Sequence, residues 1–128
     1  PVHLNPVVQE AVRRSQLGTC PNVLLLPPLS YHNLVYVLDA ACGVATDSGG
    51  ISEEAVSLGK PTLILRNETD RPECLATGQA LLVGTDEVKI QEGLAWLRAV
   101  AESHQSGNSP FGDGKAGERI ASIIEGLL

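Results

Sequence analysis

Two features of this sequence predict an α/β fold with a parallel sheet. Short apolar runs alternate with segments whose apolar residues recur at helical spacing, and the joints between them are short. Hydrophobic residues make up 43% of the chain but aromatic residues only 3%, so the core must be aliphatic, which is typical of buried parallel strands covered by helices. Because strand–helix–strand units close as right-handed crossovers, we expect a Rossmann-like three-layer α/β/α sandwich. A length of 128 residues suits a single domain over 1–128.

The first third of the chain carries two helix signals and one strand signal. Asn5 is a good N-cap and Pro6 suits the first helical position, so a helix is expected over 6–15. The continuous apolar run 23–26, bounded by Asn and Pro residues, predicts a buried strand. Residues 1–4 are expected to end a strand, and Ser30 to cap a helix over 31–41.

The middle of the chain predicts the sheet. Short apolar segments at 43–46, 62–65 and 80–83 are the expected strands. Between the first two, residues 47–50 turn the chain into a helix over 51–58 that Gly59 closes. A short helix is expected over 73–77.

Two further helices are expected toward the C-terminus. Thr85 should cap the first, with acidic residues in its first turn, where the helix dipole favours them. Its apolar positions recur at spacings of four, three and four residues, which is helical: Ile90, Leu94, Leu97 and Ala101. A polar, glycine-rich loop over 103–114 precedes a terminal amphipathic helix carrying Ile120, Ile123, Ile124 and Leu127.

Composition and charge argue against several classes of partner. The net charge of −6 repels nucleic acid and anionic membranes, and no Lys/Arg cluster offers a local exception. The longest apolar stretch, 34–45, is interrupted by Asp39 and is too short to span a bilayer. The widely spaced Cys20, Cys42 and Cys74 are expected to be free thiols in a reducing cytosol, and we expect no metal and no cofactor. Because the chain contains no methionine and begins at Pro1, we expect it to be part of a longer protein.

The segment Thr46–Glu54 is the candidate ligand site. It follows a predicted strand and opens a helix, and ligands of parallel sheets gather beyond the carboxyl ends of the strands. Gly49 and Gly50 would let a phosphate approach the backbone, where free N–H groups and the helix dipole favour an anion. Glu54, one turn later, would accept hydrogen bonds from a ribose diol. In the competing interpretation, Asp47 or Ser48 is only an N-cap and the glycines only shape a tight strand-to-helix turn.

A set of motifs over most of the chain resembles the UDP-N-acetylglucosamine 2-epimerases of the non-hydrolysing bacterial type. That family has Thr-Asp-Ser-Gly-Gly, Glu-Glu-Ala, Ser-Leu-Gly-x-Pro and Arg-Pro-Glu in this order and near this spacing. Here they correspond to 46–50, 53–55, 57–61 and 71–73, and further matching stretches are 2–6, 82–86 and 109–114.

The resemblance implies a fold and a binding site. The chain would be the C-terminal half of a GT-B-like enzyme and would hold most of the UDP of UDP-GlcNAc. By motif match, Ser48, Gly49 and Gly50 would bind the diphosphate, Glu54 the ribose hydroxyls, and Arg71 would lie near the nucleotide. The loop 31–34 would border the uracil, and His3 aligns with a histidine that helps hold a second, allosteric UDP-GlcNAc.

The resemblance also implies an activity that this chain does not complete. The family interconverts UDP-GlcNAc and UDP-ManNAc by eliminating UDP and adding it back on the other face of the sugar. Its acid/base carboxylates belong to the N-terminal domain, so we expect no catalytic residue here and binding without turnover. The implied partners are UDP or UDP-GlcNAc, the N-terminal domain and, at full length, a second copy in a cytoplasmic homodimer that serves cell-envelope polysaccharide synthesis.

Other interpretations stay open at this point. Arg71 could instead form an ordinary surface salt bridge with its acidic neighbours. Glu53 is expected to be solvated or paired with Lys60 or Arg66 rather than functional. The chain could also be a stand-alone UDP-sugar binding module or a fragment of a GT-B glycosyltransferase.

Overall fold

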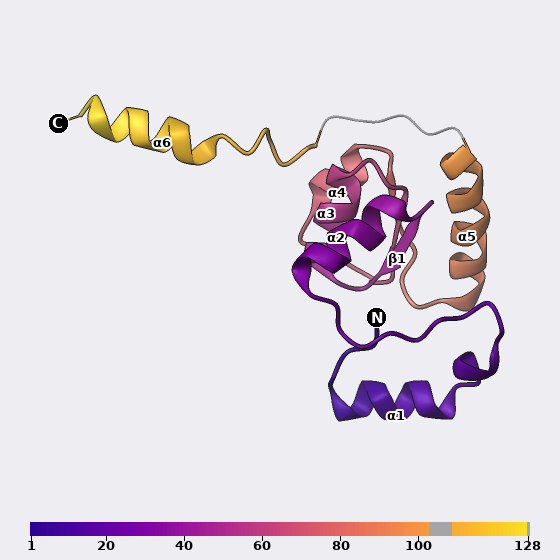
Figure 1. The fold of residues 1–128 in the computed structure, drawn as a ribbon. Helices are drawn as coiled ribbons and strands as arrows, with labels where there is room; N and C mark the ends of the chain where they lie inside the picture. Colours follow the sequence, from indigo (N-terminus) through magenta and orange to yellow (C-terminus); the bar gives the residue numbers. More distant parts are fainter. Residues whose placement is uncertain (103–108, 128) are drawn as a thin grey trace. The chain divides into compact units, whose positions relative to one another are not determined.

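The computed structural model describes residues 1–102 and 109–127, so part of the predicted loop 103–114 lies outside the described residues. The chain divides into two compact units, 1–37 and 38–128 (Figure 1). Each unit is described by itself. No helix within the described ranges is long and apolar enough to cross a membrane.

The unit 1–37 contains the predicted first helix but neither predicted strand. Helix α1 (Pro6–Arg14) begins as expected, because Asn5 Oδ1 accepts the backbone N–H of Val7 at 2.9 Å. A 3₁₀ turn, η1 (Leu17–Thr19), follows. The strands predicted at 1–4 and 23–26 are wrong, since the two segments share a single backbone hydrogen bond, from Val2 to Leu26 at 2.8 Å. Two prolines directly after this apolar run have no N–H to extend such a ladder.

Helix α2 (Tyr31–Ala40) confirms the helix predicted after Ser30, whose carbonyl accepts the N–H of Leu34 at 2.9 Å. Lys60 secures the C-terminal end of α2. Its buried ammonium donates to the carbonyl of Asp39 and lies 3.6 Å from the Asp39 carboxylate. A cation at this position also complements the negative end of the helix dipole.

The sheet confirms the three central strands. Strands β1 (Val44–Thr46), β2 (Thr62–Ile64) and β3 (Ala80–Leu82) lie side by side in that order, and both pairs are parallel. Their registers place Val44, Thr62 and Ala80 in one row, so the carboxyl ends of all three strands lie at the same edge.

Successive residues of β2 face opposite layers, as the pleat of a strand requires. Ile64 packs in one core cluster with residues of helices α3 (Gly49–Ser57) and α4 (Pro72–Ala76), namely Val56 and Cys74. Leu63 packs in a second cluster with Leu97 of helix α5 (Glu87–Glu102). The sheet is therefore covered on both faces, which confirms the predicted Rossmann-like three-layer architecture (Figure 1).

Two predicted helix starts need correction. Helix α3 begins at Gly49 rather than at 51, with Ser48 as its N-cap. Helix α5 begins after Asp86, whose carboxylate accepts the N–H of Lys89 at 3.0 Å, so Asp86 and not Thr85 caps it. The terminal helix α6 (Ala116–Glu125) is present, and its apolar side chains are exposed: Ile120, Ile123, Ile124 and, just beyond it, Leu127.

Candidate functional site

The candidate site lies where the three strands end. β1 leads through Asp47 and Ser48 directly into α3, and β2 leads through the loop 65–71 into α4. Backbone hydrogen bonds continue the ladder one residue beyond β2 and β3, from the Leu65 N–H to the Thr46 carbonyl at 2.9 Å and from the Val83 N–H to the Ile64 carbonyl at 3.0 Å. Because the ends are in register, the start of α3 and the loop 65–71 meet at one edge. This is the edge at which open parallel sheets bind ligands.

The first turn of α3 has free hydrogen-bond donors. Ser48 Oγ accepts the N–H of Ile51, but at 3.4 Å this is a long bond. The N–H groups of Gly49 and Gly50 have no acceptor among the residues that the structure describes. Unpaired N–H groups at a helix start, together with the helix dipole, form a site for an anion.

Gly49 and Gly50 are not needed by the fold of the described residues. Both lie in the helix, and neither has a positive φ. A Cβ at Gly50 would meet no atom within 4 Å, and one at Gly49 would lie 3.7 Å from Asp70 Oδ1, an ordinary contact. The interpretation that these glycines only shape a tight turn does not match this geometry, although Ser48 is an N-cap as that interpretation requires.

Glu54 has one carboxylate oxygen without a partner. The residue is half-buried, and its Oε2 is buried without a hydrogen bond among the described residues. A buried polar atom left unpaired destabilises the protein unless a ligand or water satisfies it. The position of Glu54 in the second turn of α3 puts this oxygen on the helix whose start carries the free donors.

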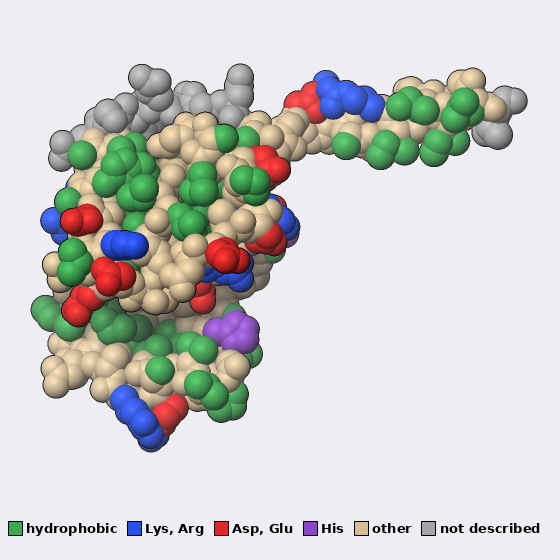
Figure 2. All heavy atoms as spheres, turned by 180° about the vertical axis from the view of Figure 1, so that it is seen from behind, with side chains coloured by type: hydrophobic (Ala, Val, Ile, Leu, Met, Phe, Trp, Pro, Cys, Tyr) green, Lys and Arg blue, Asp and Glu red, His purple; other side chains and the backbone are tan. Residues whose placement is uncertain are grey.

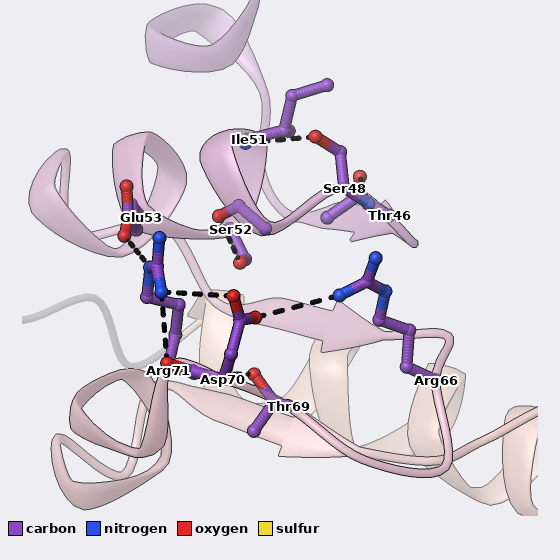
Figure 3. A network of polar contacts seen from close by, with 10 residues as sticks. Thr46, Ser48, Ile51, Ser52, Glu53, Arg66, Thr69, Asp70 and Arg71 are labelled. Atoms are coloured by element: carbon purple, nitrogen blue, oxygen red, sulfur yellow. Dashed lines mark hydrogen bonds and ion pairs between the residues drawn. The ribbon is translucent and has the colours of Figure 1, made fainter.

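Arg71 lies at the centre of a charged network on the loop before α4 (Figure 3). Its Nε donates to Glu53 of α3, and its Nη1 donates to the carbonyl of Asp70 at 3.0 Å and to Asp70 Oδ2 at 3.1 Å. Arg66 Nη1 lies 3.7 Å from the other oxygen of Asp70. The hydrogen bond to Glu53, and then the charge of Asp70, raise the pKa of the Arg71 guanidinium above its ordinary value.

The network corrects the expected partner of Glu53. Lys60 and Arg66 were the predicted partners, but Lys60 is paired with Asp39 and Arg66 with Asp70. Glu53 instead binds Arg71, which is 18 positions further along the chain. No sequence spacing predicts this pair, because it depends on the strand register that brings α3 and the loop 65–71 to the same edge. The salt bridge expected in the ordinary interpretation of Arg71 is thus present, and Nη2 of the guanidinium has no acceptor among the residues that the structure describes.

Figure 2 shows no broad area of basic side chains among the described residues on the face that it presents. On the face in Figure 2, acidic and basic side chains lie next to one another rather than in separate areas, in keeping with the net charge of −6. An anion at this edge would therefore depend on the backbone donors of α3 and on individually placed guanidinium groups.

Two predicted ligand positions belong to the unit 1–37. His3 is exposed, and its Nδ1 accepts the backbone N–H of Asn5 at 3.0 Å. The segment 31–34, expected beside the uracil, forms the first turn of α2, and Tyr31 is exposed. Their roles in ligand binding stay predictions.

The described residues contain no metal-binding group of three or more His, Cys, Asp or Glu side chains. Cys20, Cys42 and Cys74 are free thiols. Cys74 packs in the core, where burial raises the pKa of its thiol, so it is poorly suited to act as a nucleophile.

Comparisons with known proteins agree with one another. The sequence profile of a family described as UDP-N-acetylglucosamine 2-epimerase matches residues 1–125. A protein of that name from Escherichia coli strain K12 is 44% identical over 128 residues, which cover 98% of this chain and 34% of the relative.

Solved structures give the same result. A Neisseria meningitidis UDP-GlcNAc 2-epimerase bound to UDP-GlcNAc is 38% identical with a TM-score of 0.79, over 97% of this chain and 34% of that one. The S. aureus MnaA–UDP co-structure is 34% identical with a TM-score of 0.86, over 98% and 35%. The chain thus spans about a third of the length of the relatives that it matches.

Proposed function

Because this chain belongs to the UDP-N-acetylglucosamine 2-epimerase family, we propose that its α3 edge binds the UDP portion of a UDP-sugar. In this proposal the free N–H groups of Gly49 and Gly50 and the hydroxyl of Ser48 hold the diphosphate. Glu54 accepts hydrogen bonds from the ribose hydroxyls, and Arg71 adds a cation beside the phosphates.

The glycine pair carries the proposal. Glycine costs about 1 kcal/mol relative to alanine inside a helix, and at Gly50 neither backbone angle nor packing in the described residues requires it. A diphosphate that approaches the backbone explains the choice, because a Cβ would occupy the space that its oxygens need.

Glu54 supports the ribose contact. Its Oε2 is an acceptor without a donor among the described residues, and a ribose diol supplies two hydroxyl donors. The solved relatives from N. meningitidis and S. aureus hold UDP-GlcNAc and UDP respectively, which supports a uridine nucleotide as the ligand class.

For the whole protein we propose epimerisation at C2 of the sugar. UDP leaves by elimination and is added back on the opposite face. The donors at α3 would stabilise the negative charge that develops on the departing diphosphate, since preorganised dipoles are most effective in a site poor in water. The carboxylates that move the C2 proton would come from another domain, with which this chain would form the active-site cleft. A cytoplasmic homodimer remains part of this proposal.

Calorimetric titration with UDP tests the binding site. We expect saturable binding by the wild-type protein that weakens in both Ser48→Ala and Glu54→Ala, with the unfolding midpoint of each variant checked first. Each variant removes one hydrogen-bond partner, so a loss of roughly tenfold or more in affinity is expected.

Uridine serves as the matched ligand in the same experiment. Ser48→Ala should weaken UDP binding far more than uridine binding, whereas Glu54→Ala should weaken both, because only the ribose contact is common to the two ligands. A folded protein that binds UDP equally well with and without these side chains would refute the site.

A further inference from the structure

The described residues pair with only part of the Arg71 guanidinium. Nε is held by Glu53, and Nη1 by the carbonyl and carboxylate of Asp70. Nη2 has no acceptor in the part of the chain that the structure describes, and 38% of the side chain is exposed. One side of the guanidinium is therefore fixed, and the remaining donors are available to another molecule (Figure 3).

The fixed side connects Arg71 to the start of α3. Glu53 belongs to the second turn of that helix, and a Cβ at Gly49 would lie 3.7 Å from Asp70 Oδ1. Both carboxylates that hold Arg71 are thus placed against the helix that offers the free N–H groups.

We propose that Glu53 is a positioning residue for diphosphate binding: its carboxylate holds Arg71 Nε so that Nη2 is presented to the phosphate oxygens. This inference rests on the proposed binding of UDP at the α3 edge and extends it to a residue that makes no ligand contact itself. A planar guanidinium binds phosphate through donors in a fixed fork, so fixing Nε also fixes the direction of Nη2.

Electrostatic repulsion alone predicts the opposite effect of Glu53 on the affinity for UDP. A carboxylate near a diphosphate repels it, so removing that charge should tighten binding if Glu53 only contributes to the local field. If Glu53 positions Arg71, its removal weakens binding, because the guanidinium loses rotational order that the ligand must then restore. Whether removal of the Glu53 carboxylate raises or lowers the UDP affinity therefore distinguishes simple repulsion from positioning of Arg71.

The test compares variants of the full natural protein that contains this chain. Glu53→Met keeps the length of the side chain and its helix propensity but removes both the charge and the acceptor. We expect the Kd for UDP to rise about two- to fivefold, the size of effect typical of a half-exposed charged contact. Glu53→Gln keeps a neutral acceptor for Nε, so its Kd should lie between those of wild type and Glu53→Met.

Glu73→Gln is the matched control. Glu73 is an exposed carboxylate in the first turn of α4 that affects Arg71 only through its charge, with no hydrogen bond to it. Its removal should leave the UDP affinity unchanged or slightly higher. Uridine affinity should not change in any of these variants, since uridine has no diphosphate.

Two further readouts separate positioning from a structural role. In Arg71→Met, which removes the cation, adding Glu53→Met should weaken UDP binding no further, because Glu53 acts through Arg71. In the NMR spectrum of the unliganded wild-type protein, the Arg71 Nε–H should exchange slowly with solvent, and Glu53→Met should accelerate that exchange.

The outcomes are distinct. UDP affinity that is unchanged or tighter in Glu53→Met, in a protein whose wild type binds UDP, would overturn the positioning role and leave the proposed function intact. A folded wild-type protein that does not bind UDP at all would overturn both.

Discussion

Two strand-to-helix joints at the same edge of the sheet, β1–α3 and β3–α5, begin their helices in different ways. Helix α5 is capped by a carboxylate, because Asp86 Oδ1 accepts the N–H of Lys89 at 3.0 Å. Helix α3 is capped by the neutral hydroxyl of Ser48 through a longer bond of 3.4 Å, and two glycines follow. The first turn of α5 is thus capped by a carboxylate, whereas the N–H groups of Gly49 and Gly50 in the first turn of α3 have no acceptor among the described residues. The proposed UDP site at the β1–α3 joint would make use of this difference.

The glycines of the two joints also differ in whether the fold requires them. Gly84, before α5, has a φ of 67°, and a Cβ there would lie 2.6 Å from Asn67 Oδ1. The fold itself therefore requires glycine at this position. Gly50 meets neither condition, so the described residues do not require glycine there.

Giving α3 the carboxylate cap of α5 should have the largest effect. Ser48→Asp keeps a good N-cap and adds a negative charge where the diphosphate would bind. We expect the Kd for UDP to rise by on the order of 100-fold, because like charges are brought together, while the unfolding midpoint stays the same or rises slightly.

The control for this variant is Ser48→Asn, which is a good cap without a charge and should weaken UDP binding only a few-fold. Calorimetry and thermal unfolding of the same samples give both quantities. Equal affinities of the Asp and Asn variants for UDP would contradict the presence of an anion at this helix start.

The substitution of Gly50 by alanine is expected to have opposite effects on stability and on UDP binding. Gly50→Ala should raise the free energy of unfolding by up to about 1 kcal/mol, since alanine favours the helix. It should weaken UDP binding roughly tenfold, since the new methyl group lies where the phosphate approaches the backbone. Chemical denaturation and calorimetry measure the two effects.

Gly93 of α5, unlike Gly50, is a glycine whose position is closely packed. A Cβ there would lie 2.9 Å from Val83 Cγ1 and 3.1 Å from Leu63 Cδ2, so Gly93→Ala should lower the free energy of unfolding by about 1–3 kcal/mol. If Gly50→Ala destabilised the protein as much as Gly93→Ala, the fold and not a ligand would account for both glycines.

Removing the carboxylate cap of α5 is expected to have a smaller effect, on stability alone. Asp86→Ala should lower the free energy of unfolding by about 1 kcal/mol, because the first turn of α5 loses its side-chain acceptor. The UDP affinity should not change. A loss of UDP binding in a folded Asp86→Ala protein would show that the α5 start takes part in the site after all.

The smallest expected effect concerns the pKa of Asp113, which lies just before α6. Asp113 accepts the N–H of Lys115 at 3.1 Å and is paired with Arg119, whose hydrogen bond is the main cause that lowers the pKa of the Asp113 carboxyl. Because the pKa of Asp113 is lower in the folded than in the unfolded protein, its ionised carboxylate stabilises the fold at pH values above the ordinary pKa of aspartate. This contribution is lost as the pH falls through the pKa of the folded state. An NMR titration of the Asp113 carboxyl should therefore show a midpoint below that of an ordinary aspartate, and Arg119→Gln should raise the midpoint. An unchanged midpoint in that variant would contradict the assigned cause.

The sequence predicted those parts of the fold that depend on local chemistry. The apolar runs of β1, β2 and β3, the Asn5 cap of α1 and the glycine that closes α3 all follow from short-range preferences. The strand predicted at 23–26 was wrong because an apolar run by itself specifies neither a pairing partner nor burial. In the structure its Leu24 is 78% exposed.

The candidate site was predictable only in part, for the same reason. The free donors at α3 depend on the segment 48–50 itself, and its position after a strand was visible in the sequence. The pairing of Glu53 with Arg71 depends on which strands are neighbours and in what register, which no local pattern encodes. Thr85 and Asp86 show the limit of cap prediction, because both are good caps and the backbone geometry decides between them.

The most direct test of the contrast between the two joints is an NMR titration of the ¹⁵N-labelled protein with UDP. Free donors at α3 predict that the amide signals of Gly49, Gly50 and Ile51 shift most, while those at the start of α5, from Asp86 to Lys89, stay in place. Shifts that concentrate at the α5 start, or saturable UDP binding that leaves the α3 amides unchanged, would contradict the proposed site.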